Sequence, residues 1–228
     1  MLVTAPVDLQ RYTQAKAGPE VAKAAVLEDA AKGLVQPEHS PKELIEILMK
    51  AGHFADAVRS MAHALPRREA VWWAVQCVKA VPAHAAGEKA AAALGAAERW
   101  AATPTDENRR AAHVAAEAAE LSTPAGCAAM AAFFSEGSLA PAALQPVPPP
   151  PHVCHAMVST AAVLAAVQQE PEKADEKYKK FLALGHDVVA GTNRWVDGRL
   201  APPTAGSQPP KPPSRPGQSP PPSGKSWY

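Results

Sequence analysis

The stretch Leu65–Val81, LPRREAVWWAVQCVKAV, decides the fold that this sequence predicts. Pro66 suits the first turn of a helix, where its missing N–H group has no intrahelical partner to lose. Beyond Glu69 the segment is apolar almost all round, which is typical of a helix buried on every side. Trp72 and Trp73 point about 100° apart on a helix, so they must pack against different neighbours. We therefore expect this helix to form the centre of an all-helical domain.

The composition points to the same fold class. Hydrophobic residues make up 47% of the 228 residues, but much of that share is alanine, and aromatic residues are only 5%. Alanine is the best helix former and is depleted in strands, and long alternating β-branched runs are absent. We expect an all-α fold, either a multi-helix bundle or an irregular array of about eight helices. A helical-repeat scaffold that binds a peptide in a concave groove stays open as an alternative.

Capping signals place several of the helices. The strongest is Ser40-Pro41-Lys42-Glu43, a capping box with proline at the first helical position. Thr103-Pro104-Thr105-Asp106 repeats this pattern of cap, proline and acid, and Thr123-Pro124 begins a further helix. The apolar residues Phe54, Val58, Met61 and Leu65 form one stripe at helical spacing. We expect helices over residues 7–17, 19–32, 40–52, 54–65, 88–101, 103–121, 123–137, 152–169 and 171–191, with Gly33 closing the second of them in the left-handed conformation.

Proline marks the domain organisation. Residues 1–200 read as one all-helical domain that contains a Pro-rich, extended connector at 140–151. Residues 201–228 read as a separate tail, in which ten of 28 residues are proline. Such a segment cannot bury enough apolar surface to fold, so we expect it to be disordered.

Charge and cysteine content bound the partners and the compartment. The net charge is +1, without a basic patch, so we expect no nucleic-acid partner. The three cysteines are an odd number without framework spacing, which favours reduced thiols. The first residues show no signal-peptide pattern, and no apolar run is long enough to span a bilayer. These features predict a soluble cytoplasmic protein without membrane insertion.

The densest group of ligand-type residues is His152-Val153-Cys154-His155, at a predicted helix start. A helix N-terminus favours a thiolate, so one hypothesis is a thiol- or metal-dependent enzyme or sensor that uses Cys154 with His152 and His155. Against it, Cys154 and His155 diverge by about 100° on a helix, and no CxxC or HxxxH motif supplies further ligands. The favoured interpretation is a buried thiol flanked by surface histidines.

Catalytic signatures are otherwise missing. The eight histidines have no fixed spacing, and the motifs GxSxG, GxGxxG and GxxxxGK[ST] are absent. We therefore predict a protein that is not an enzyme, with no catalytic residues, no cofactor and no metal ligands.

Two regions are candidates for binding another protein. Arg67 and Arg68 begin the central helix, where they either grip a carboxylate of a partner or cap neighbouring helix ends and pair with Glu69. In the tail, the segment 210–215 fits the PxxPxR pattern that SH3-like grooves bind, and two aromatic residues end the chain. The predicted partner-binding residues are Arg67, Arg68, Pro210, Pro213, Arg215, Trp227 and Tyr228.

Three segments together resemble an uncharacterised bacterial family, a domain of unknown function. They are ALPRREAVWWA at 64–74, SEGSLAP at 135–141 and ALGHDVVAGTNRW at 183–195. The resemblance covers about residues 5–198 and excludes the tail; it implies no catalytic residues, and it implies an association with type VI secretion gene neighbourhoods. With the missing motifs, it predicts a non-enzymatic interaction or adaptor protein, such as an accessory or chaperone-like factor of that secretion system.

Overall fold

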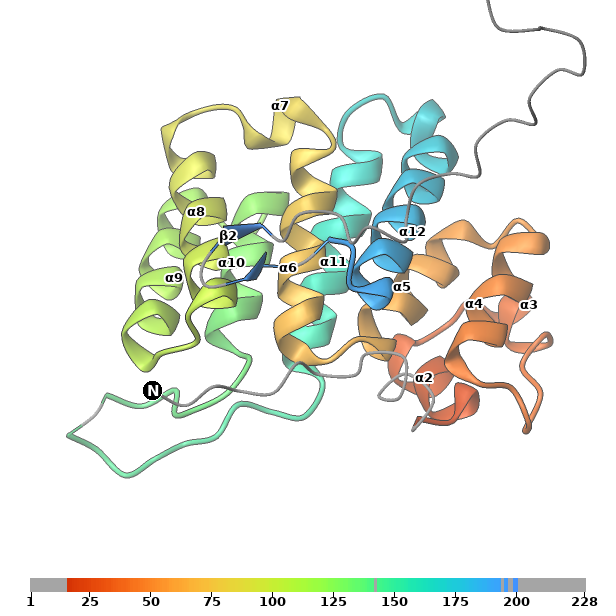
Figure 1. Ribbon diagram of the computed structural model, residues 1–228, viewed down its shortest axis with the longest axis horizontal. Coiled ribbons are helices and arrows are strands. Elements are labelled where there is room, and N and C mark those ends of the chain that lie inside the picture. Colours follow the sequence, from red (N-terminus) through yellow and green to blue (C-terminus); the bar gives the residue numbers. More distant parts are fainter. Residues whose placement is uncertain (1–15, 142, 194, 197–198, 201–228) are drawn as a thin grey trace, which may run out of the picture.

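The computed structural model describes residues 16–141, 143–193, 195–196 and 199–200, and these residues form an all-helical array (Figure 1). The eleven α-helices of the described residues confirm the predicted fold class, although single-turn helices such as α3 and α7 raise the count above the expected eight. None of the described helices is both long and apolar enough to cross a membrane. The elements are α2 Gly18–Ala25, α3 Asp29–Lys32, α4 Pro41–Lys50, α5 Phe54–Ala64, α6 Arg67–Lys79, α7 Pro82–Ala85, α8 Glu88–Ala102, α9 Asp106–Ala119, α10 Pro124–Phe133, α11 Val153–Val167, the 3-10 turn η1 Pro171–Lys173, α12 Ala174–Ala190, and the antiparallel pair β1 Trp195–Val196 and β2 Arg199–Leu200.

Two helices share the centre of the array. From Glu69 to Val78 every residue of α6 except Gln76 is buried, and α6 packs against α8, α10, α11 and α12. The predicted central helix is therefore confirmed. All ten residues of α10 are buried as well, because this helix packs against α6, α8, α9 and α11. The core thus has a second buried helix, made mainly of alanine.

The adjacent tryptophans of α6 do face different neighbours. The Trp73 indole Nε1–H donates to the carbonyl oxygen of Phe181 in α12, at 2.8 Å. The Trp72 Nε1–H donates to the backbone and side-chain oxygens of Asn193, both at 3.2 Å. Each large apolar side chain is therefore buried with its polar group satisfied.

The predicted caps Ser40 and Thr123 are present, whereas the helix expected to begin at Thr103 begins two residues later, with Thr105 as its cap. Ser40 Oγ accepts from the Glu43 backbone N–H at 3.3 Å, while Glu43 Oε2 accepts from the Ser40 backbone N–H at 2.9 Å. Thr105 Oγ1 accepts from the Asn108 N–H at the start of α9, and Thr123 Oγ1 accepts from the Gly126 N–H at the start of α10. Local sequence therefore fixes where α4, α9 and α10 begin.

The expected helix over 19–32 is interrupted, and its expected cap is wrong. Val26 adopts the left-handed conformation with φ 52°, and Gly33 does not, with φ −63°. The turn at Val26 lets the Glu28 N–H donate to the buried Asp56 carboxylate at 3.1 Å, and it buries Leu27 in the core. A tertiary contact outweighs local helix propensity here. The expected helix over 7–17 lies almost wholly outside the described residues.

The connector at 140–151 contains no helix or strand among its described residues, as predicted. Its first part is held to the helices rather than detached from them. The Leu139 N–H donates to the Val147 carbonyl at 2.7 Å, and Arg110 Nη2 donates to the Ala140 carbonyl at 2.9 Å. From there the chain runs along the edge of the array to the start of α11 (Figure 1).

A buried arginine, Arg109 of α9, fixes the loop that precedes this connector. Its side chain is 1% exposed, and its Nη1 and Nη2 donate to the carbonyls of Phe133 and Ser138 at 2.9 and 2.7 Å. Asp106 accepts from the same guanidinium, with a shortest distance of 2.6 Å, and the Phe133 ring lies 4.8 Å from it. We call Arg109, Asp106, Phe133 and Ser138 the Arg109 cluster. Its buried charge is paired and hydrogen-bonded throughout.

Candidate functional site

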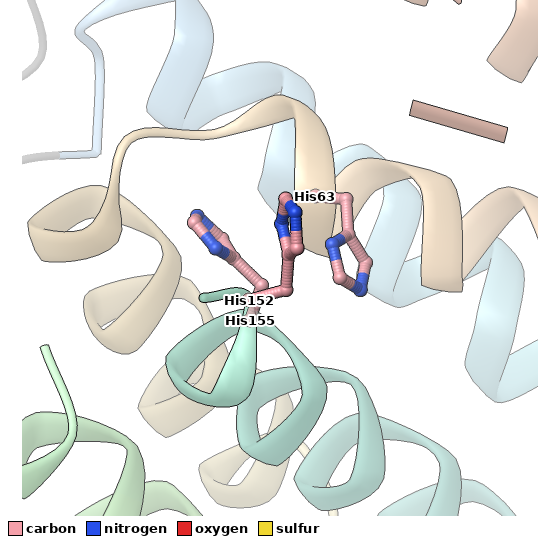
Figure 2. A group of neighbouring side chains, drawn as sticks. All are labelled: His63, His152 and His155. Atoms are coloured by element: carbon pink, nitrogen blue, oxygen red, sulfur yellow. The ribbon is translucent and has the colours of Figure 1, made fainter. Parts of the chain in front are cut away.

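Three histidines meet between α5 and the start of α11. His63 lies in the last turn of α5, His152 is the N-cap residue of α11, and His155 lies in the first turn of α11 (Figure 2). One ring nitrogen of each lies within 4.8 Å of those of the other two. The ring centroid of His63 is 6.1 Å from that of His152 and 5.4 Å from that of His155. His63 and His155 are buried, whereas His152 is exposed.

The backbone of His152 contributes to this convergence. His152 has φ 65° and ψ −8°, a left-handed conformation that is uncommon for a residue with a Cβ atom. It lies between the last proline of the connector, Pro151, and the first turn of α11. Residues 152 and 155 then lie on one face of the helix start, because they are three positions apart.

The histidines line an open pocket of about 540 Å³. Two long cationic side chains, Lys16 and Arg67, lie on its wall, and Glu20 is the one carboxylate among its lining residues. The Lys16 ammonium donates to the His63 carbonyl at 2.9 Å, and Arg67 Nη1 donates to the Ser135 carbonyl at 2.7 Å. We call this cavity the histidine pocket; it is lined by Lys16, Glu20, Val21, Ala24, His63, Arg67, Pro151, His152 and His155.

Burial and like charge together suppress protonation in the histidine pocket. Burial, then the charges of His152 and Lys16, lower the pKa of His63 to about 4. Burial also lowers the pKa of His155 to about 3, with further lowering from Lys16, His63 and Arg67. The pKa of the Lys16 ammonium is lowered by burial and by the charge of Arg67. His63 and His155 are therefore neutral near pH 7 and carry lone pairs.

The predicted thiol does not belong to this group. Cys154 is 1% exposed, and burial raises the pKa of its thiol to about 12, although the helix N-terminus was expected to favour the thiolate. Burial also raises the pKa of Cys127 to about 11, and that of Cys77 rises as well. The interpretation of Cys154 as a buried thiol is confirmed. The accompanying prediction, that the histidines flanking this thiol lie on the surface, is correct for His152 and wrong for His155.

The two predicted arginines have different surroundings. Arg68 caps the C-terminal end of α8, since its Nε and Nη2 donate to the carbonyls of Ala101 and Ala102 at 2.5 and 2.8 Å. Arg67 is exposed on the histidine pocket, and no carboxylate of the described residues forms an ion pair with it. Of the two, Arg67 alone is on the pocket wall. The predicted tail residues Pro210, Pro213, Arg215, Trp227 and Tyr228 lie outside the described residues.

Sequence reasoning missed His63 and Lys16. The short spacing of His152 and His155 was visible, but nothing in the local sequence ties either to a histidine in α5. One signal was available: His63 falls on the apolar side of α5, beside Met61 and Ala64, where a buried histidine needs polar neighbours. Only the packing of α5 against α11 shows which residues those neighbours are.

Comparison with known proteins gives a family and no function. No curated protein and no solved structure matches this chain. One family does match, over residues 44–189, a range that includes all three histidines and Arg67. This confirms the expectation of an uncharacterised domain. The chain belongs to the family of unknown function DUF6931.

Proposed function

We propose that this chain is a non-enzymatic interaction protein whose helical domain binds an acidic group of a partner protein in the histidine pocket. The observation that carries the proposal is the charge of that pocket. Arg67 and Lys16 stand on its wall beside three imidazoles, against the single carboxylate of Glu20. A pocket of this kind attracts anions and repels cationic groups.

Arg67 is the residue best suited to the contact. Its side chain is exposed, and the hydrogen bond from its Nη1 to the Ser135 carbonyl holds the guanidinium at the pocket edge. A guanidinium offers five N–H donors in a planar fork that matches a carboxylate. A carboxylate of a partner would also offset the repulsion between Arg67 and Lys16 that lowers the pKa of Lys16.

The burial of the three thiols supports a binding role over catalysis. The thiols are buried with raised pKa values, which removes the nucleophile of the alternative thiol-dependent enzyme.

The tail is proposed as a second binding element through Pro210–Arg215 and Trp227–Tyr228. A role as an accessory factor of a type VI secretion system stays a prediction from the family resemblance.

The test is an affinity pull-down from native host lysate, analysed by mass spectrometry. Baits carry an N-terminal tag and comprise residues 1–228, residues 1–200, and full-length Arg67→Glu. The control is full-length Arg99→Glu, which makes the same charge reversal at an exposed arginine of α8. The Arg67→Glu change places an acid at the first position of α6, where the helix dipole favours it, so folding is preserved.

We expect Arg67→Glu to lose partners that Arg99→Glu and the 1–200 bait retain, and we expect capture to weaken as salt rises. Partners that only full-length baits capture would assign the interaction to the tail. Equal capture by Arg67→Glu and Arg99→Glu, or substrate turnover by the purified chain, would contradict the proposal.

A further inference from the structure

The three histidines of the pocket also form a set of nitrogen ligands that neither the family nor the proposed function assigns. They come from two elements that pack against each other, α5 and the start of α11, and their rings are neighbours (Figure 2). Their nearest ring nitrogens already lie within 4.8 Å of one another. We infer that His63, His152 and His155 together bind a divalent transition-metal ion, for which zinc is the reference.

The spacing fits this inference. Zinc–nitrogen bonds are about 2.0–2.1 Å long, so two nitrogens on a tetrahedral zinc lie about 3.4 Å apart. The observed spacing exceeds that value by on the order of 1 Å, which small rotations of the side chains can close. His152 is exposed and is the ring with most room to move.

The hydrogen bond of His155 prepares it as a ligand. Its Nε2 lies 3.1 Å from the carbonyl oxygen of Leu65, which can only accept, so the N–H of the neutral ring belongs on Nε2. Nδ1 is then left with a lone pair. Metal-binding histidines commonly donate their second ring N–H to a backbone carbonyl in this way, which fixes the tautomer and the ring orientation.

The protonation state of the rings is also suitable. A metal competes with protons for imidazole nitrogens, so affinity at neutral pH is highest where the rings are already neutral. Burial keeps His63 and His155 neutral near pH 7 through their lowered pKa values. Imidazole ligands without thiolate or carboxylate suit zinc, copper, nickel and iron rather than calcium or magnesium.

Three protein ligands leave one coordination position, and it faces the histidine pocket. The positive charges of Lys16 and Arg67 oppose a bare dication, so they favour an anionic fourth ligand that lowers the charge of the bound metal. The inference does not rest on the proposed function, because the metal is held by this chain alone. A partner carboxylate is nevertheless one ligand that the fourth position would accept.

A substitution at His152 can test metal binding without changing the backbone conformation. Asparagine tolerates the left-handed conformation that His152 adopts, so His152→Asn removes the imidazole and keeps the backbone. The matched control is His186→Asn in α12, a partly exposed histidine outside the cluster. A second ligand variant, His63→Gln, tests the site from the other helix.

The experiment titrates Co²⁺ into full-length protein from which any polyhistidine tag has been removed, and follows the visible d–d bands of tetrahedral cobalt. We expect one Co²⁺ per chain, displacement by Zn²⁺, and a melting temperature that rises with metal. His152→Asn should bind at least ten times more weakly, and His186→Asn should bind like the natural chain.

Circular dichroism of each variant guards against misfolding. If His63→Gln fails to fold, His152→Asn decides the matter on its own, because its side chain is exposed. No tetrahedral cobalt spectrum from the natural chain, or equal affinity in His152→Asn and His186→Asn, would overturn the inference. Since no partner is present, a failed pull-down leaves this result unaffected.

Discussion

The Arg109 cluster and the histidine pocket both contain cationic side chains, yet they are built in opposite ways. Arg109 is almost fully buried, and a carboxylate, two backbone carbonyls and an aromatic ring surround its guanidinium. The histidine pocket gathers Lys16, Arg67 and three imidazoles around one carboxylate, that of Glu20. A buried charge whose partners all come from the same chain has a structural role. Like charges placed close together repel one another, as the lowering of the Lys16 pKa by Arg67 shows, and an anionic ligand would offset that repulsion.

The largest expected effect separates the two arginines of α9. Arg109→Leu leaves the Phe133 carbonyl without its donor and the Ser138 carbonyl with only the long 3.4 Å contact from Arg110, and it should lower the free energy of unfolding by about 3–5 kcal/mol. Arg110→Ala, at a half-exposed side chain bonded to Asp106 and Ala140, should cost less than about 1 kcal/mol. Urea denaturation measures both. Similar losses for the two variants would mean that the Arg109 cluster is not the structural element described.

The second prediction uses pH to separate the two regions in metal-free protein, with chelator present. His63 and His155 have folded pKa values near 4 and 3, below their ordinary value of 6.5. Between pH 6.5 and 4 the unfolded chain therefore binds more protons, so the free energy of unfolding falls as the pH falls. One pKa unit corresponds to about 1.36 kcal/mol, so each of the two histidines should contribute a loss of roughly 3 kcal/mol by pH 4.

The Arg109 cluster should respond only at lower pH. Hydrogen bonds from Arg110 and Arg109 hold the pKa of Asp106 below its ordinary 3.8, so its ion pairs persist until the pH falls below that value. His155→Gln can still donate to the Leu65 carbonyl but cannot titrate, and it should flatten the loss between pH 6.5 and 4. An unchanged slope in this variant would show that His155 is not the responsible group.

The third prediction adds to the histidine pocket a carboxylate near its cationic side chains, as Asp106 lies beside Arg109 in the Arg109 cluster. Ala24→Glu introduces a carboxylate on the pocket wall formed by α2, near Arg67 and Lys16. It should stabilise the chain by roughly 0.5–1 kcal/mol at low salt, and less at high salt, because the ion pair is partly exposed. Ala24→Gln is the neutral control for size. Thermal unfolding at two salt concentrations checks the difference, and equal stability of the two variants would argue against the charge imbalance.

The smallest expected effect is a gain of stability at a proposed ligand. His152→Gly removes a Cβ atom from a left-handed residue and should stabilise metal-free protein by about 0.5 kcal/mol, while also removing metal binding. The same change at His186, inside α12, should instead cost about 1 kcal/mol. Chemical denaturation measures the free energy of unfolding of both variants. A loss of stability in His152→Gly would mean that the backbone at position 152 is not strained.

The sequence predicts the helices well where the signal is local. Ser40 and Thr123 start helices where their caps predict, the pattern at Thr103 misplaces the start of α9 by two residues, and the apolar run of α6 is buried as its pattern indicates. The prediction fails where distant segments decide the outcome. Val26 breaks a helix because the Glu28 N–H meets Asp56 of α5, and no turn residue announces it.

The candidate site was only half visible for the same reason. Helix geometry correctly separates Cys154 from His155, but it cannot bring His63 next to them, since that depends on how α5 packs against α11. Arg109 was equally hidden, because α9 is rich in alanine and charge, which predicts one solvated face but does not show which charged residue is buried. Its buried face consists of Arg109, Ala112, Ala116 and Ala119, in which one charged residue occupies a core position.

The indole hydrogen bonds of α6 have a consequence for the chain during its synthesis. Trp73 bonds to a carbonyl 108 residues later in the sequence, and Trp72 to a residue 121 later. While a ribosome is still translating the intervening segment, α6 lacks the partners that cover its two largest side chains. A nascent chain halted before Phe181 would therefore present tryptophan surface to chaperones and proteases, and the central helix α6 would be covered only when the last helix, α12, arrives.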